Sequence, residues 1–221
     1  MREVVLDTET TGLSPKSHRV VEIGCVELVN SIPSGREFHT YLRPDDDYMP
    51  SEAFAIHGIS QEFLRDKPRF AEIVDDFLVF LDGARLVAHN AEFDIGFLNA
   101  ELARVEHPPL TGEVLDTVRL ARRKFPGSPA SLDALCQRFG VDASTREKHG
   151  ALLDAHLLAE VYVELAGTRQ PGLDIVAETR AEADPVTHRK RREPRPHGAS
   201  TAELAAHEAF LAGITDPVWN R

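Results

Sequence analysis

Short apolar runs separated by Gly, Pro and Asn open the chain and predict a meander of neighbouring strands. The runs cover residues 3–7, 19–29 and 36–42, and β-branched side chains are frequent in them. Helical periodicity replaces this pattern at residues 70–81, where apolar side chains recur three and four positions apart. The first predicted helix therefore begins at residue 70, after three strands.

Strands and helices alternate in the next part of the chain. Short strands are predicted at residues 85–88 and 113–116. Helices are predicted at about 91–105, 117–124, 131–139 and 151–166. Consecutive strands followed by alternation are typical of a mixed α/β sheet, here of five strands, flanked by helices.

The composition changes after Leu165. Residues 167–172, GTRQPG, interrupt the helical pattern, and residues 178–200 contain almost no large apolar side chain. Such a segment cannot bury enough apolar surface to fold, so it is predicted to be a flexible linker. Residues 200–214 start with a Ser-Thr N-cap signal and resume helical periodicity. A short amphipathic helix beyond a linker is expected to dock on a partner.

The apolar content and the cysteines limit the class of protein. With 221 residues, 42% of them hydrophobic, the chain can bury one core. No apolar stretch is long enough for a membrane span, and no signal peptide is recognisable, so a cytoplasmic protein is expected. Cys25 and Cys136 are far apart and lack metal-ligand spacing, which predicts two buried core residues.

The formal net charge of −11 argues against strong nonspecific binding of nucleic acid. Such binding depends mostly on Lys and Arg neutralising phosphates. The excess acidity falls within the first 170 residues. It fits a protein that binds divalent cations, one that a partner delivers to its substrate, or simple solubility.

Two carboxylates, Asp7 and Glu9, close the first strand in the stretch VVLDTETTG. Side chains two apart on a strand share a face, so both acids point the same way. Adjacent anions raise the free energy unless a cation lies between them. Taken alone, the pair is better explained by a strand that ends at Asp7 and a solvated Glu9, with Thr8 and Thr10 making turn hydrogen bonds.

Two further acids interrupt the apolar stripes of predicted helices. Asp94 precedes Phe97 and Leu98 on one stripe, and Asp154 heads a second stripe. Neither stripe carries a matching Lys or Arg, and an unpaired charge on a buried stripe is costly. Four converging carboxylates predict a site for Mg²⁺ or Mn²⁺, which prefer oxygen ligands.

His149 is the remaining candidate. Gly150 allows it to lie just before the last long helix and to lean back over Asp154. A histidine beside a metal site can accept a proton from the attacking water. In isolation it would instead be read as a surface or capping histidine.

The motifs DTETTG, HNAEFD and HGALLD, in this order, resemble the three exonuclease motifs of the DEDD superfamily, in the branch with His in the third motif. Residues 1–166 are similar throughout to the family of epsilon proofreading subunits of bacterial DNA polymerase III. The segments that carry this similarity are VVEIGCVEL, SEAFAIHGIS, LVAHNAEFDIGFLNAEL and EKHGALLDAHLLAEVY. The resemblance implies an RNase H-like exonuclease fold.

The resemblance also implies the activity and the roles of the five residues. The expected reaction is the proofreading removal of mismatched 3′-terminal nucleotides from DNA as deoxynucleoside monophosphates. Asp7, Glu9, Asp94 and Asp154 are expected to hold two metal ions, and His149 to act as general base. Glu9 and Asp154 would also contact the substrate.

Further contacts follow from the same resemblance. Residues that would hold the terminal nucleotide are Thr8, Glu52, His57 and Phe93, with Glu52 and His57 in a loop before the first helix. Residues 1–168 would form the exonuclease domain, 169–200 the linker and 201–221 a segment that binds the polymerase alpha subunit. In that segment the expected contacts are Leu204, His207, Phe210, Leu211 and Trp219. Gln170, Leu173 and Ile175 have the spacing of a peptide that binds the sliding clamp.

Two other functions compete with proofreading. A stand-alone DNA exonuclease or an RNase of the same fold would not need the linker and the C-terminal helix. A non-catalytic connector in the replisome would use only those two segments. The intact acidic residues argue against the connector, because a scaffold has no use for a costly cluster of carboxylates.

Overall fold

The computed structural model describes residues 1–45, 48–144, 146, 148–167 and 198–215. The chain divides into two units, Met1–Asp174 and Ile175–Arg221, which are considered separately. The predicted clamp-binding residues Gln170, Leu173 and Ile175 lie outside the described residues, as does Trp219. The site predicted from the three motifs belongs entirely to the first unit.

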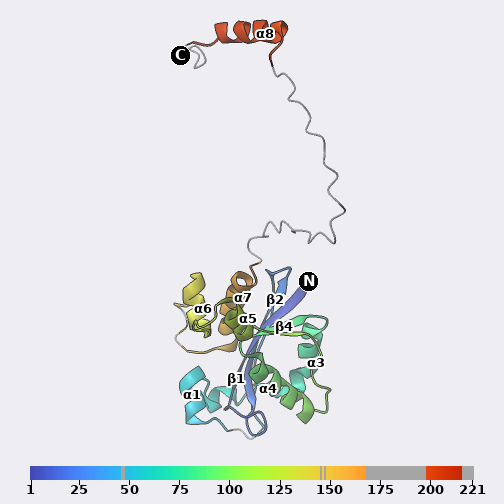
Figure 1. Ribbon diagram of the computed structural model, residues 1–221. Helices are drawn as coiled ribbons and strands as arrows, with labels where there is room; N and C mark the ends of the chain where they lie inside the picture. The colour runs from blue at the N-terminus through green and yellow to red at the C-terminus, as the bar shows by residue number, and fades with distance from the viewer. Residues whose placement is uncertain (46–47, 145, 147, 168–197, 216–221) are drawn as a thin grey trace, which may run out of the picture. The chain divides into compact units, whose positions relative to one another are not determined.

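A mixed five-stranded sheet forms the centre of the first unit, as predicted (Figure 1). Its strands are β1 (Arg2–Thr10), β2 (Val20–Val29), β3 (Ile32–Tyr41), β4 (Arg85–Ala88) and β5 (Val114–Asp116), in the order β3-β2-β1-β4-β5. The meander β1-β2-β3 is antiparallel, whereas β4 runs parallel to β1, and β5 runs parallel to β4. β1 is therefore the central strand.

Helices cover both faces of this sheet (Figure 1). They are α1 (Ser51–His57), α2 (Gln61–Leu64), α3 (Phe70–Leu81), α4 (Ala91–Arg104), α5 (Thr117–Lys124), α6 (Leu132–Phe139) and α7 (Ala151–Ala166). Side chains alternate along β1: Val4 and Leu6 pack in the core with α3 and α4, whereas Val5 packs in the core with α5, α6 and α7. Each face of β1 is thus tied to a different group of helices.

The structure differs from the predicted elements in three places. β1 continues to Thr10, three residues beyond its predicted end, and β3 begins at Ile32 instead of residue 36. Helices α1 and α2 lie in a stretch that was predicted to be a loop. The buried side of α1 consists of Ala53 and His57, while Phe54 and Ile56 are exposed. Its apolar pattern therefore does not mark the buried face.

The cysteine prediction is confirmed, since Cys25 and Cys136 are both buried and free. They pack in the two cores on opposite faces of the sheet. None of the described helices is long and apolar enough to cross a membrane.

In the second unit, α8 (Thr201–Ala212) occupies the predicted helical stretch. Ser200 caps it: its hydroxyl accepts a hydrogen bond from the Glu203 amide, and the Glu203 side chain accepts one from the Ser200 amide. The apolar side chains Leu204 and Phe210 are 53% and 64% exposed. His207 is exposed as well, and Leu211 is partly buried.

The first turn of α7 lies directly on β2 at Gly24. A Cβ atom added to Gly24 would lie 2.3 Å from the Ala151 carbonyl carbon and 2.3 Å from the Leu152 nitrogen. Neither backbone atom can move without shifting the whole turn. Glycine at this position therefore sets the distance between the sheet and the helix.

We expect Gly24→Ala to lower the free energy of unfolding by about 3 kcal/mol, because the added methyl group overlaps backbone atoms. Gly96→Ala is the control, since no atom of the described residues outside the backbone of α4 lies within 4 Å of a Cβ at that position, and it should be neutral or stabilising by up to about 1 kcal/mol. Urea unfolding of both variants measures the difference. Equal effects would mean that α7 can move away from β2.

Candidate active site

The end of β1 distributes three polar side chains over the two faces of the sheet. Asp7 and Glu9 continue the face of Val5, toward α7, and Thr8 lies on the opposite face, toward α4. Glu9 is 8% exposed, and Thr8 is 6% exposed. The expectation that Asp7 and Glu9 share a face is therefore confirmed, even though β1 does not end at Asp7.

α4 contributes Asp94 from its first turn. Asn90 precedes the helix in the left-handed region, with φ 67°, and turns the chain from β4 into α4. The carboxylate is 2% exposed. One of its oxygens, Oδ1, accepts hydrogen bonds from the Thr8 amide at 3.0 Å and the Thr8 hydroxyl at 2.7 Å. Asp94 is thus fixed to the backbone of β1 at Thr8, the residue between Asp7 and Glu9.

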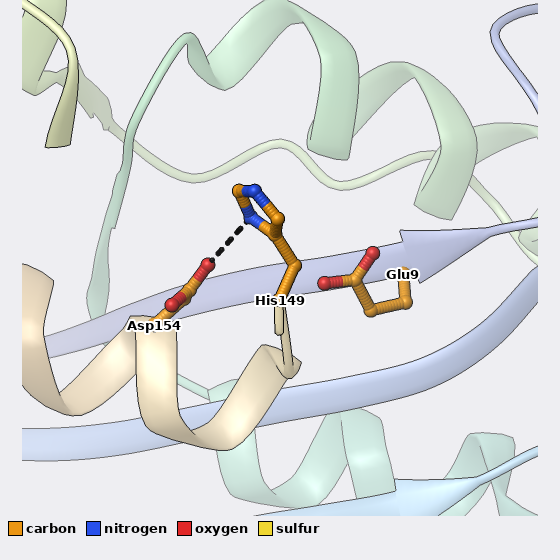
Figure 2. Close-up of side chains that lie close together, drawn as sticks. All are labelled: Glu9, His149 and Asp154. Carbon is orange, nitrogen blue, oxygen red and sulfur yellow. Dashed lines mark hydrogen bonds and ion pairs between the residues drawn. The ribbon is translucent and has the colours of Figure 1, made fainter. Parts of the chain in front are cut away.

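α7 contributes Asp154, and the segment just before α7 contributes His149 (Figure 2). Gly150 is the N-cap of α7 in an extended conformation, so His149 precedes the helix. Its Nδ1 lies 3.2 Å from Oδ2 of Asp154. One ligand atom each from Glu9, His149 and Asp154 lie within 4.8 Å of one another. His149 therefore leans back over Asp154, as predicted.

All five predicted catalytic residues line one cavity of about 310 Å³. Thr8 and Phe93 line it too, together with His89, Asn90, Asp133 and Arg146. The cavity lies where β1, α4 and the start of α7 meet. The three sequence motifs therefore converge on a single pocket.

Glu52 and His57 do not line this cavity. Glu52 is exposed on α1 and accepts a hydrogen bond from the Ser51 hydroxyl. His57 is buried, and its Nδ1 accepts a hydrogen bond from the Ile59 amide at 3.0 Å. Its Nε2 is buried and has no hydrogen-bond partner among the residues that the structure describes. Both residues belong to a helix and not to the predicted loop.

The expectation that the carboxylates lack a basic partner is wrong. Arg146 donates to both oxygens of Asp154, from Nε and Nη2, each at 2.6 Å. Its Nη2 also lies 2.7 Å from Nδ1 of His149, and its Nη1 pairs with Asp133. Arg146 reaches the pocket from the segment before α7, so a search of the helical stripes could not find it. Its place three residues before His149 was the available signal.

The concentration of negative charge raises the pKa values of the acids. Burial, followed by repulsion from Glu22, Asp154 and Asp94, raises the pKa of Glu9 to about 8. Burial and the neighbouring carboxylates also raise the pKa of Asp7 well above its usual range. The pKa of Asp94 rises to about 7, mainly through burial, although hydrogen bonds from Thr8 oppose the rise. One guanidinium does not balance this charge, so the pocket fits divalent cations.

We expect Glu9→Gln to flatten the pH dependence of stability in EDTA. Glu9 titrates near 4.5 when unfolded and near 8 when folded, so the folded chain binds more protons between these values. The free energy of unfolding must then fall as pH rises through this window. At about 1.4 kcal/mol per pKa unit, the free energy of unfolding of the wild type should fall by on the order of 3 kcal/mol more than that of the variant over this pH range. Urea unfolding from about pH 5 to 8 measures both, and parallel curves would contradict the assignment.

Comparison with known proteins identifies the family. The model of the exonuclease family RNase_T matches residues 4–162. The DNA polymerase III subunit epsilon of Rickettsia felis is 48% identical over 223 residues, covering 97% of each protein. That of Escherichia coli K12 is 45% identical over 224 residues, covering 95% of this chain and 92% of the relative.

Solved structures agree with this family. Exonuclease X in complex with 5′ overhanging duplex DNA is 31% identical, with a TM-score of 0.58, over 75% of this chain and 91% of that one. The nuclease domain of 3′hExo, a DEDDh family member bound to rAMP, is 19% identical and has a TM-score of 0.65, over 75% of this chain and 92% of that one, which supports the fold alone. The chain therefore belongs to the RNase_T exonuclease family and, within it, to the epsilon subunits of DNA polymerase III.

Proposed function

We propose that the chain is the proofreading 3′–5′ exonuclease of a bacterial replicative DNA polymerase and hydrolyses 3′-terminal nucleotides from DNA. The convergence of Asp7, Glu9, Asp94, His149 and Asp154 on one cavity carries the proposal. The family model spans all five residues. Hydrolysis would release a deoxynucleoside monophosphate. A mismatched end would be preferred, because an unpaired end frays at lower cost.

Exonucleases of this family generally use divalent metal ions, and the donor set of the pocket fits them. Asp7, Glu9, Asp94 and Asp154 would hold two ions, Mg²⁺ or Mn²⁺. Carboxylate oxygens are the ligands that these ions prefer. When bound, the ions would activate the attacking water and stabilise the charge on the scissile phosphate and the leaving 3′ oxygen.

His149 would accept the proton of the attacking water. A guanidinium can only donate hydrogen bonds, so Nδ1 of His149 must accept while Arg146 contacts it. If Arg146 moves away, Nδ1–H can donate to Asp154, which leaves the Nε2 lone pair free to act as the base. Half of the His149 side chain is exposed, so solvent can reach it.

The terminal nucleotide would be held by side chains around the same pocket. Phe93 packs against Phe97 with ring centroids 4.8 Å apart and lines the cavity, where it could stack on a base. Thr8 and its backbone would grip the nucleotide beside Glu9. Glu52 and His57 would approach it from α1.

The part of the chain after the exonuclease domain would connect it to the replication machinery. Residues 201–221 would bind the polymerase alpha subunit, with the exposed Leu204 and Phe210 of α8 as apolar contacts. Residues 170–175 would bind the sliding clamp. A polymerase subunit of this kind would act in the bacterial cytoplasm. Because the domain is acidic, it would bind DNA weakly by itself and depend on the polymerase for delivery.

We expect His149→Ala to lower the rate of 3′ nucleotide release by about 10² to 10⁴-fold, the usual contribution of a general base. His156→Ala is the matched control, because this histidine lies on α7 but pairs with Glu37 and does not line the cavity. Release from matched and mismatched primer-templates is measured with Mg²⁺, with Mn²⁺ and with EDTA. Pure wild-type protein that releases nothing from DNA would contradict the proposal. Faster release from RNA than from DNA would favour an RNase.

We expect Arg146→Gln to make the metal-free protein less stable by about 3 kcal/mol, because buried carboxylates lose their cation. Mg²⁺ should then raise its melting temperature more than that of wild type, since no guanidinium has to leave Asp154. Arg119→Gln is the control, because the Arg119 side chain is 78% exposed and lies 3.6 Å from Asp116, outside the pocket. Equal metal-induced shifts in all three proteins would show that Arg146 does not compete for Asp154.

A further inference from the structure

A fifth buried acid, Glu22, faces the site from the neighbouring strand. It lies on β2 directly opposite Glu9 in the antiparallel register and is 2% exposed. It does not line the cavity. Its two oxygens have separate partners: Oε2 accepts a hydrogen bond from the Ala151 amide at 3.1 Å, and Oε1 lies 2.8 Å from Nε2 of His39.

The bond to Ala151 replaces a missing helix cap. The first amides of a helix have no partner within the helix and usually bond to the side chain of the N-cap residue. The N-cap of α7 is Gly150, which has no side chain to offer. Glu22 on β2 supplies this acceptor instead, although it lies 129 residues away in the sequence. Its negative charge also suits the positive end of the helix dipole.

The Ala151 amide, which Glu22 caps, lies in the sequence between two residues of the site. His149 precedes Ala151 by two positions, and Asp154 follows it by three. Gly24, two residues after Glu22 on the same face of β2, allows backbone contact with Ala151 and Leu152. Glu22 and Gly24 therefore fix both the rotation and the height of the first turn of α7 above the sheet.

We propose that Glu22, oriented by His39, is a positioning residue for the exonuclease site. By holding the Ala151 amide, it sets where His149 and Asp154 stand relative to Glu9. Glu22 need not touch the substrate for this role. The expected effect on kcat rests on the proposed function. The expected effect on metal binding can be measured without a substrate.

Glu27 provides a matched control on the same strand. It is 3% exposed, and hydrogen bonds of 2.6 Å join it to Arg2 and to Ser34. It lies on the opposite face of β2 from Glu22, away from α7. Glu22 and Glu27 are thus equally buried and hydrogen-bonded, but only Glu22 contacts the start of α7.

The test compares full-length wild type with Glu22→Ala, Glu22→Gln and Glu27→Ala. Four quantities are measured: the melting temperature, the Mn²⁺ concentration that gives half of the metal-induced rise in melting temperature, and kcat and KM for release from a single-stranded oligonucleotide. Both alanine variants should lose melting temperature in EDTA. Only Glu22→Ala should lower kcat, by about ten- to a hundredfold, since small misplacements of catalytic groups have effects of this size.

Glu22→Ala should also need a several times higher Mn²⁺ concentration for half of the metal-induced rise in melting temperature, while its KM stays close to that of wild type. Glu22→Gln should restore most of kcat and of the Mn²⁺ response, because the amide oxygen can still accept from Ala151. If Glu22→Ala does not fold, Glu22→Asp replaces it, since the shorter side chain cannot reach the Ala151 amide.

Two results would overturn the inference. In one, Glu22→Ala has the kcat and the Mn²⁺ midpoint of Glu27→Ala, and Glu22 is then an ordinary structural acid although the proposed function stands. In the other, Glu22→Gln is as defective as Glu22→Ala, so that charge rather than position matters. If wild type releases no nucleotide, the proposed function fails, and the Mn²⁺ midpoints still decide the role of Glu22.

Discussion

Repulsion between buried carboxylates is the constraint on which the first unit of this protein depends. Asp7, Glu9, Asp94 and Asp154 share a pocket that raises the pKa values of the first three. A fold meets such a cost only when other interactions hold the acids in place. Thr8 holds Asp94 through two hydrogen bonds, and Arg146 holds Asp154 through two more.

The sheet makes this arrangement precise enough for chemistry. β1 is central and packed on both faces, so Asp7 and Glu9 start from a rigid strand. The site lies at the carboxyl end of β1 and of the parallel strand β4, where open α/β sheets commonly bind ligands. On the side of α7, close backbone contact at Gly24 and the hydrogen bond from Ala151 to Glu22 set the position of the helix.

Arg146 neutralises part of the negative charge of the pocket. With the guanidinium on Asp154, the metal-free site is partly neutralised, and Nδ1 of His149 faces a donor. In the proposed reaction the guanidinium would pair with Asp133 alone, which would leave Asp154 free for metal and His149 free for proton transfer. The acidity of the chain, −11 overall, therefore has a local meaning as well as a global one. Around the pocket it favours cations, and elsewhere it opposes nonspecific attraction to phosphates.

The sequence by itself determined the sheet class, the long helices and the five residues of the pocket, because strand alternation, helical periodicity and the three motifs are local patterns. Only the tertiary structure decided which partners those residues have. Arg146 lies outside every helical stripe, and Glu22 meets Ala151 across 129 residues, so neither contact leaves a periodic signal. α1 escaped detection because its large apolar side chains Phe54 and Ile56 face solvent. Contacts between distant segments depend on how the sheet and helices pack, and that packing is settled only when the whole chain folds.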